Sequence, residues 1–412
     1  MRQAALALAL ATAACSDQPP AGDRFPIYVD RPGGALTTQV AIDGAAPVTA
    51  VIDVLSPLTV VDVAADAAPR RAGIDLTILG RRAPGDDARV TRARFRPTAL
   101  FQHPCAAAEV CTVGDPAAPV PIGAVIGGDT LRDDALRVRA GDDTIYILDD
   151  IAGEGAARDR ACDAVIDSAF HGGGTLVVGG TEVAFAGLRP AVGLCLSPDP
   201  CAASASARGV DATLLVSSGL GPSILAASRY EAWRQVSGAP ALADLPEVTV
   251  RLPSGAVTGR AGQIDRFAIA GRAVPPDGAC REIYRHYYLT GAAACLATGD
   301  DPCVDDDSCS APAVVELATA IAVVVIADDA PLLQSLRAEL RPGLPEVDGI
   351  LGLDALTAVE LDVDYPNTRL LVRCAGAGCA LRPPYRDGTS AEVIAQCLAR
   401  ATPAVDAGVD AP

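Results

Sequence analysis

The sequence predicts an all-β protein built from two related lobes, and three observations support this. The chain has 412 residues, which exceeds the size at which a single hydrophobic core normally stops growing. Short runs of apolar and β-branched residues alternate with Gly, Pro and Asp turns, a pattern typical of strands. An apolar strand that ends at a polar turn occurs once in each half of the chain, at 51–62 and at 214–223.

Composition and spacing divide the chain into six parts. We expect a signal peptide at 1–15, a tether at 16–24, a first lobe at 25–150, a linking segment at 151–162, a second lobe at 163–398 and a tail at 399–412. The tail consists mainly of Ala, Pro and Asp, a composition that does not favour a packed core.

The N-terminus has the features of an export signal. Arg2 supplies a positive charge, residues 4–11 form a short apolar core, and small residues follow. The end of this segment, residues 12–15, resembles the lipobox of bacterial lipoproteins, although Thr12 stands where Leu is usual. We therefore expect Cys15 to be lipidated and the protein to be a membrane-anchored lipoprotein, in the periplasm or on the outer surface of a bacterium. An ordinary cleaved signal peptide is the alternative.

Charge and cysteine content narrow the classes of ligand. The net charge of −18 argues against a nucleic-acid partner, because phosphates need a basic surface. Without Cys15 an even number of cysteines remains in an exported chain, which favours disulfides over zinc. We expect no metal or cofactor, a monomer, and the pairs Cys105–Cys111, Cys195–Cys201, Cys303–Cys309, Cys374–Cys379, Cys280–Cys295 and Cys162–Cys397.

Strands are expected through both halves. In the first half they lie at 25–29, 36–42, 48–54, 59–63, 75–79, 88–100, 135–139 and 144–148. In the second they lie at 175–178, 182–185, 211–216, 248–252, 266–269, 359–363 and 370–372, with a long apolar stretch at 313–326. A helix is predicted from Pro222 to Val236, because Pro is favoured in a first turn and apolar residues recur there at helical spacing.

Each half also contains a turn of the form apolar-apolar-Gly-x-Asp-x-Leu, at 125–131 and at 350–356. Two strand-and-loop units, each followed by this turn, resemble the pepsin-like aspartic peptidases over about 25–381. The resemblance implies a bilobal fold of two β-barrel-like lobes with few short helices. It also implies one catalytic loop in each lobe. An unrelated β-sandwich with chance Gly turns is the alternative.

The first loop keeps the acid of the family motif and loses its neighbours. The family motif is Asp-Thr/Ser-Gly, in which Asp holds the reacting water, the hydroxyl braces the opposite loop and Gly allows a tight turn. Asp53 matches the Asp, whereas Val54 and Leu55 stand in the other two positions. Valine cannot supply the bracing hydroxyl, and leucine is bulky where the family has no side chain.

The second loop shows the opposite loss. Ser218 and Gly219 match the motif, but Ser217 replaces the second Asp. The reaction needs two carboxylates that share a proton, and a serine hydroxyl cannot take that role. The mobile hairpin of the family usually carries a Tyr, and the interval 73–101 has none. We therefore expect an inactive, pseudo-peptidase centre at Asp53 and Ser217.

The sequence leaves several functions open. We expect a module that binds an extended peptide or an envelope protein; the main alternative is an active aspartic endopeptidase that uses Asp53 with an unusual partner such as Asp62. A purely structural surface protein is a third hypothesis. Two weaker ones are a serine–histidine dyad, formed with His103, His171 or His286, and a Ca²⁺ site in the acidic run 300–307, which fits no EF-hand pattern.

Overall fold

The structure is a computed structural model of the chain. It describes residues 26–62, 70–71, 75–81, 83–95, 100–103, 112–113, 119–148, 164–166, 170–178, 181–197, 209–252, 255–270, 314–339, 346–375 and 379–382. The predicted lipidation site Cys15, the linking segment and the tail lie outside these ranges. Within them, no helix is both long and apolar enough to cross a bilayer.

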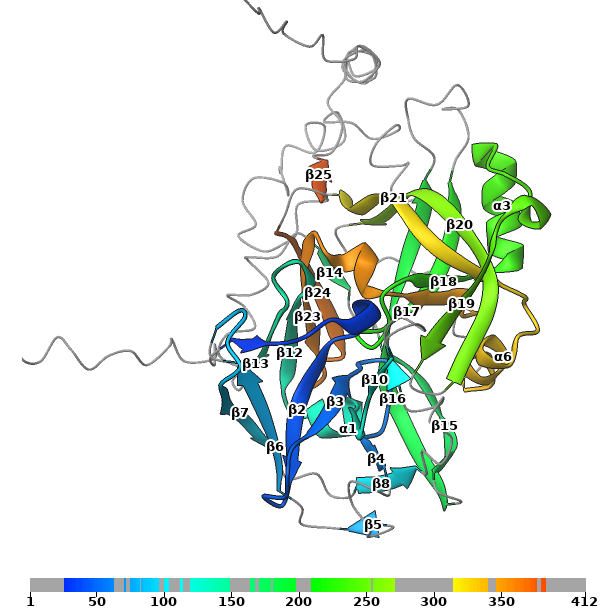
Figure 1. The fold of residues 1–412 in the computed structure, drawn as a ribbon. Coiled ribbons are helices and arrows are strands. Elements are labelled where there is room, and N and C mark those ends of the chain that lie inside the picture. The colour runs from blue at the N-terminus through cyan, green and yellow to red at the C-terminus, as the bar shows by residue number, and fades with distance from the viewer. Residues whose placement is uncertain are drawn as a thin grey trace, which may run out of the picture.

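The described chain is mostly β-strand, as predicted, and the first half forms one lobe (Figure 1). Its elements are β1 (Ile27–Tyr28), β2 (Thr37–Ile42), β3 (Val48–Ile52), β4 (Val60–Asp62), β5 (Arg70–Arg71), β6 (Leu76–Arg81), β7 (Arg89–Phe95), β8 (Leu100–His103), β9 (Thr112–Val113), β10 (Val120–Pro121), β11 (Ala124–Ile126), α1 (Gly128–Leu131), β12 (Ala135–Arg139) and β13 (Thr144–Leu148).

The second half forms a lobe of similar plan with longer strands. Its elements are β14 (Ala164–Ile166), β15 (Phe170–Val178), β16 (Thr181–Ser197), β17 (Val210–Val216), β18 (Ser223–Ala226), α3 (Ala227–Ser237), β19 (Glu247–Leu252), β20 (Gly255–Ala270), β21 (Val314–Ile326), α6 (Pro331–Ala338), β22 (Gly349–Leu351), β23 (Val359–Asp364), β24 (Arg369–Cys374) and β25 (Ala380–Arg382), with a 3₁₀ turn at Leu353–Leu356.

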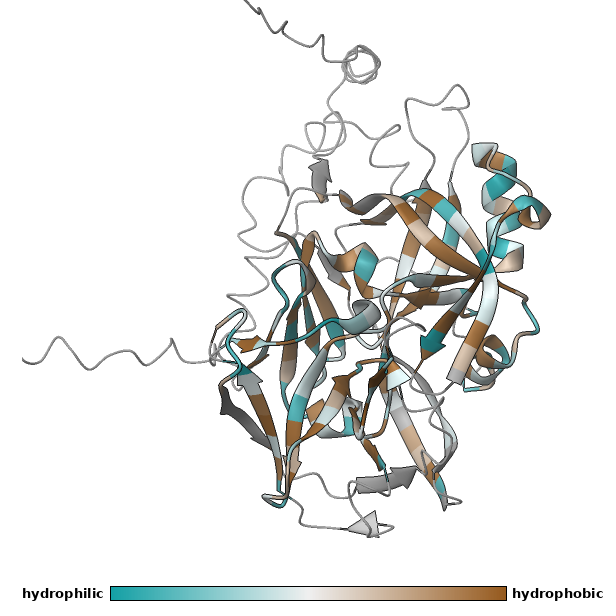
Figure 2. Ribbon diagram, in the orientation of Figure 1, coloured by the Kyte–Doolittle hydropathy of each residue, from teal (hydrophilic) through white to brown (hydrophobic). Residues whose placement is uncertain are grey.

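Two large curled sheets hold these strands, except that β9 and β10 pair only with each other. The first runs in the order β14-β24-β23-β12-β13-β1-β6-β2-β3-β11-β4-β8-β5, with β7 beside β6. The second runs β15-β16-β17-β22-β18-β21-β20-β19, with β25 beside β21. Hydrophobic residues follow the strands of both lobes, whereas α3 on the outside of the second lobe is largely hydrophilic (Figure 2). The main hydrophobic core contains buried residues from both halves, so the lobes pack as one body.

The two halves meet in a continuous antiparallel seam between β12 and β23. Arg137 on β12 forms a two-point ion pair with the opposite residue Asp362, at 2.7 Å from Nε to Oδ1 and 2.9 Å from Nη2 to Oδ2. Arg139, farther along the strand, forms an ion pair through Nε with its opposite residue Glu360. Both acids are buried, so their charges require these arginines.

The predicted start of the helix at Pro222 is wrong. Residues Ser223–Ala226 form β18, which pairs in parallel with β21 and antiparallel with β22, and the helix α3 begins only at Ala227. These residues form a strand instead of a helix because they are buried between two neighbouring strands of the sheet. This tertiary packing outweighs the preference that their local helical spacing indicates. The described helix ends at Ser237, one residue beyond the predicted end.

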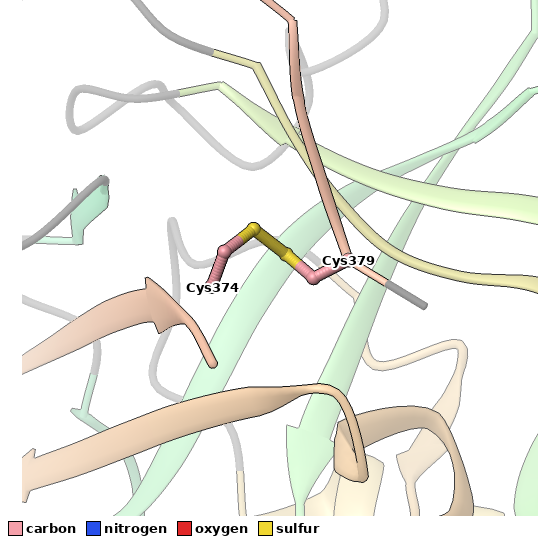
Figure 3. Close-up of a disulfide and its surroundings, with 2 residues drawn as sticks. All are labelled: Cys374 and Cys379. Atoms are coloured by element: carbon pink, nitrogen blue, oxygen red, sulfur yellow. A yellow bond between two sulfur atoms is a disulfide. The ribbon is translucent and has the colours of Figure 1, made fainter. Parts of the chain in front are cut away.

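One of the six predicted disulfides can be seen in full. Cys374, at the end of β24, is bonded to Cys379, just before β25 (Figure 3). Cys195 on β16 is also disulfide-bonded. Its predicted partner Cys201 lies outside the described residues, as does at least one member of every other predicted pair.

Candidate functional site

The same strand-and-loop unit is built once in each lobe. In the first, β11 lies between the two strands that flank the loop 53–59, parallel to β3 and antiparallel to β4. In the second, β22 lies in the same way between β17 and β18, which flank the loop 217–222. The two loops are therefore equivalent in topology as well as in sequence.

Matching hydrogen bonds fix the alignment of the two units residue by residue. In the first lobe Gly127 donates its N–H to Thr59 Oγ1 at 3.0 Å, and in the second Gly352 donates to Ser223 Oγ at 3.1 Å. The glycines are required there, because a Cβ on either would lie 2.4 Å from a backbone oxygen. Thr59 and Ser223 are thus equivalent positions.

The alignment makes Asp53 and Ser217 equivalent. Asp53 donates its backbone N–H to the carbonyl of Ile126, and Ser217 donates to the carbonyl of Leu351, both at 3.0 Å. Each therefore stands at the point where its strand ends and its loop begins. The two loops face one another, and Ser217 Oγ donates a hydrogen bond of 2.9 Å to Asp53 Oδ1.

The Asp53 carboxylate is buried and held through one oxygen. Besides Ser217, the backbone N–H groups of Leu55, Ser218 and Gly219 donate to Oδ1 at 3.0, 3.2 and 3.1 Å. Burial raises the pKa of Asp53, and these hydrogen bonds, with the positive charge of Arg189, offset part of that rise. Asp53 is only 7% exposed, and three of its four hydrogen-bond donors come from the opposite loop, so it holds the two loops together.

A serine hydroxyl links the two loops from one side. Ser218 Oγ accepts the Val54 N–H at 3.1 Å and donates to the Ile52 carbonyl at 2.6 Å, so it links the two lobes across their interface. Val54 has no hydroxyl with which to make the reciprocal contact. The Ser218 N–H points instead to the Asp53 carboxylate.

Leu55 is an interlobe contact. Its partly buried side chain packs against a hydrophobic cluster of the second lobe that includes Leu220 and Ile224. Its carbonyl accepts a hydrogen bond from Arg189 Nη1. Arg189, on β16, is itself buried and forms a two-point ion pair with Glu339 at the end of α6, with 2.9 Å between Nη2 and Oε1.

Arg189 and Glu339 are site residues that the sequence did not reveal. A signal was present, because Arg189 is the one charged residue in the otherwise apolar run 188–192. A charge in such a run is costly to bury unless it is paired. Its partner could not be named, because Glu339 lies far away in the chain and meets it only through the packing of α6.

A second acid, Asp129 of α1, supports the first loop through hydrogen bonds to Thr59. Asp129 Oδ1 accepts hydrogen bonds from the backbone N–H and the hydroxyl of Thr59, at 2.7 and 2.8 Å. Burial raises the pKa of Asp129 to about 6, and the bonds from Thr59 counter only part of this effect. Asp129 therefore changes charge in a mildly acidic range.

The partners of Asp53, Ser217 and Ser218 within the described residues do not include the other residues considered from the sequence. Asp62 ends β4, in register with His103 of β8, and is not among the hydrogen-bond partners of Asp53. Ser217 and Ser218 each have one hydroxyl proton, which goes to Asp53 and to the Ile52 carbonyl, so neither hydroxyl donates to a histidine. His286 and the acidic run 300–307 lie outside the described residues.

No metal centre is formed within the described ranges. No group of three or more His, Cys, Asp or Glu residues that could hold a metal ion occurs there.

No model of a protein family matches the sequence, and no curated protein matches it. The chain is similar to a solved aspartic proteinase from Irpex lacteus, at 9% identity over 85% of this chain and 97% of that one, with a TM-score of 0.33. It is similar to basic 7S globulin from soybean (13%, 87% and 96%, TM-score 0.40). A third similar structure is conglutin gamma, a basic 7S globulin from lupine seeds (10%, 86% and 95%, TM-score 0.39). Likeness at this level says nothing about activity.

Proposed function

We propose that this protein is an exported lipoprotein with a pepsin-like fold that has lost peptide hydrolysis and binds an extended peptide or an envelope protein. The observation that carries the loss of hydrolysis is the 2.9 Å hydrogen bond from Ser217 Oγ to Asp53 Oδ1. A hydroxyl stands where the reaction needs a second carboxylate, so Asp53 has no partner with which to share a proton. Loss of one acid–base partner typically costs about 10²–10⁴-fold in rate.

The binding role is supported by what the centre retains. Ser218 still bridges the loops, and Gly219 still allows the close approach to Asp53. Both repeated units are complete although the second acid is missing, which favours a role that depends on shape. The predicted lipid anchor at Cys15 and the tether at 16–24 would hold this domain at a membrane surface, where such a partner would be met.

Hydrolysis is tested with purified protein and an acid-denatured protein substrate between pH 3 and pH 7. We expect no cleavage above that of Asp53→Asn. Cleavage that is abolished by Asp53→Asn and by a transition-state peptide inhibitor would establish the rival function, an acid endopeptidase. The raised pKa of Asp53 is the property of the site that is also compatible with an acid endopeptidase.

Binding is tested separately, by calorimetric titration with a set of synthetic extended peptides and with purified envelope proteins. Saturable binding of at least one of them is expected. Absence of any saturable binding would favour the purely structural surface protein. Mass spectrometry of the protein from membranes, with a diacylglycerol modification on Cys15, would test the anchor.

A further inference from the structure

Gly219 lies so close to Asp53 that no other residue fits. A Cβ built on Gly219 would lie 2.8 Å from Asp53 Cγ and 2.9 Å from Asp53 Oδ2. Carbon atoms of side chains do not approach this closely without a shift of the backbone or of the carboxylate. An acid at the end of one strand therefore requires a glycine at the third position of the opposite loop.

The equivalence of the two loops places the reverse pair at Leu55 and Ser217. Leu55 stands in the first loop where Gly219 stands in the second. By this equivalence the Cβ of Leu55 is expected to face Ser217 as Gly219 faces Asp53. Leu55 has the Cβ that Gly219 lacks. Its side chain and carbonyl are both held, by the hydrophobic cluster of the second lobe and by Arg189, so it cannot simply move aside.

We propose that Leu55 and Ser217 are sterically coupled: the Cβ of Leu55 occupies the space that a carboxylate at 217 would need, so residue 217 has to be small. The centre has thus exchanged its second acid for a packing contact between the lobes. This coupling gives a physical reason for the proposed loss of hydrolysis, and its biological meaning rests on that proposed function. Replacing Ser217 alone by an acid cannot rebuild the dyad while Leu55 is present.

The coupling is tested with Ser217→Asn, because Asn has the shape of Asp without a charge that Asp53 would repel. The change is made in three backgrounds: wild type, Leu55→Ala and Leu55→Gly. Leu55→Ala is the matched control, since it removes the packing of the leucine but keeps the Cβ. The measurement is the melting temperature of each variant relative to its own background.

Ser217→Asn should lower the melting temperature by about 5 °C in the wild-type and Leu55→Ala backgrounds, a typical effect of overpacking. In the Leu55→Gly background the loss should fall to less than half. If Ser217→Asn prevents folding in the first two backgrounds, recovery of folding in the Leu55→Gly background would equally support the coupling. Equal losses in all three backgrounds, or failure to fold in all three, would overturn the proposal. These measurements involve no peptide, so they stand or fall independently of the proposed function.

Discussion

Removal of the Ser218 hydroxyl should weaken the interface between the lobes. Ser218 is 1% exposed, and its Oγ bridges the Val54 N–H and the Ile52 carbonyl. Ser218→Ala leaves two buried backbone groups without this partner, at about 1–3 kcal/mol for each unsatisfied group. We therefore expect the free energy of unfolding to fall by about 2–6 kcal/mol.

Urea unfolding and amide hydrogen exchange measure this effect. Ser237→Ala is the control, because Ser237 Oγ donates to the carbonyl of Trp233 within one helix and links no lobes. Ser218→Thr should keep most of the stability, since it keeps the hydroxyl. The Val54 amide should exchange faster in Ser218→Ala alone. An unfolding midpoint equal to that of Ser237→Ala, with unchanged exchange at Val54, would refute the bridging role.

Three further perturbations address other contacts. Because the pKa of Asp129 is raised, its contribution to stability is present at acidic pH and is lost as the pH rises through about 6. Asp129→Asn should therefore reduce the fall in unfolding free energy between pH 4 and pH 7 by about 2 kcal/mol, which calorimetry across that range measures. Arg189→Met leaves the Glu339 carboxylate buried and unpaired and should lower the free energy of unfolding by about 3–5 kcal/mol, whereas the double variant with Glu339→Leu should lose less; urea midpoints compare them. Replacing Cys374 and Cys379 by Ser opens a short covalent loop and should lower the free energy of unfolding by about 2 kcal/mol in non-reducing denaturation.

The repeated loops could be found from the sequence because their signals are local. A polar residue that closes an apolar strand, and a glycine turn later in each half, recur in the same order. The facing of Asp53 and Ser217 followed from that repeat. The sequence also indicated that Leu55 was out of place in the motif, but not where its side chain would pack.

The remaining features depend on contacts between distant parts of the chain. Leu55 finds its cluster, and Arg189 its acid, only once the second lobe has folded. The same reason explains the error at Ser223–Ala226, whose strand pairs with β21 and β22 and cannot be recognised from its own spacing. Local pattern predicts most of the elements, but pairing with distant strands overrides it at Ser223–Ala226.

The seam between β12 and β23 has a consequence for how the two halves recognise each other. The first half contributes Arg137 and Arg139 to it, and the second half contributes Asp362 and Glu360. A slip of one residue would turn each acid toward the opposite face of the sheet, away from its arginine. The charges therefore encode both the partner and the register of the join. If each half folded separately, it would expose an edge strand whose hydrogen bonds and charges are matched only by the other half.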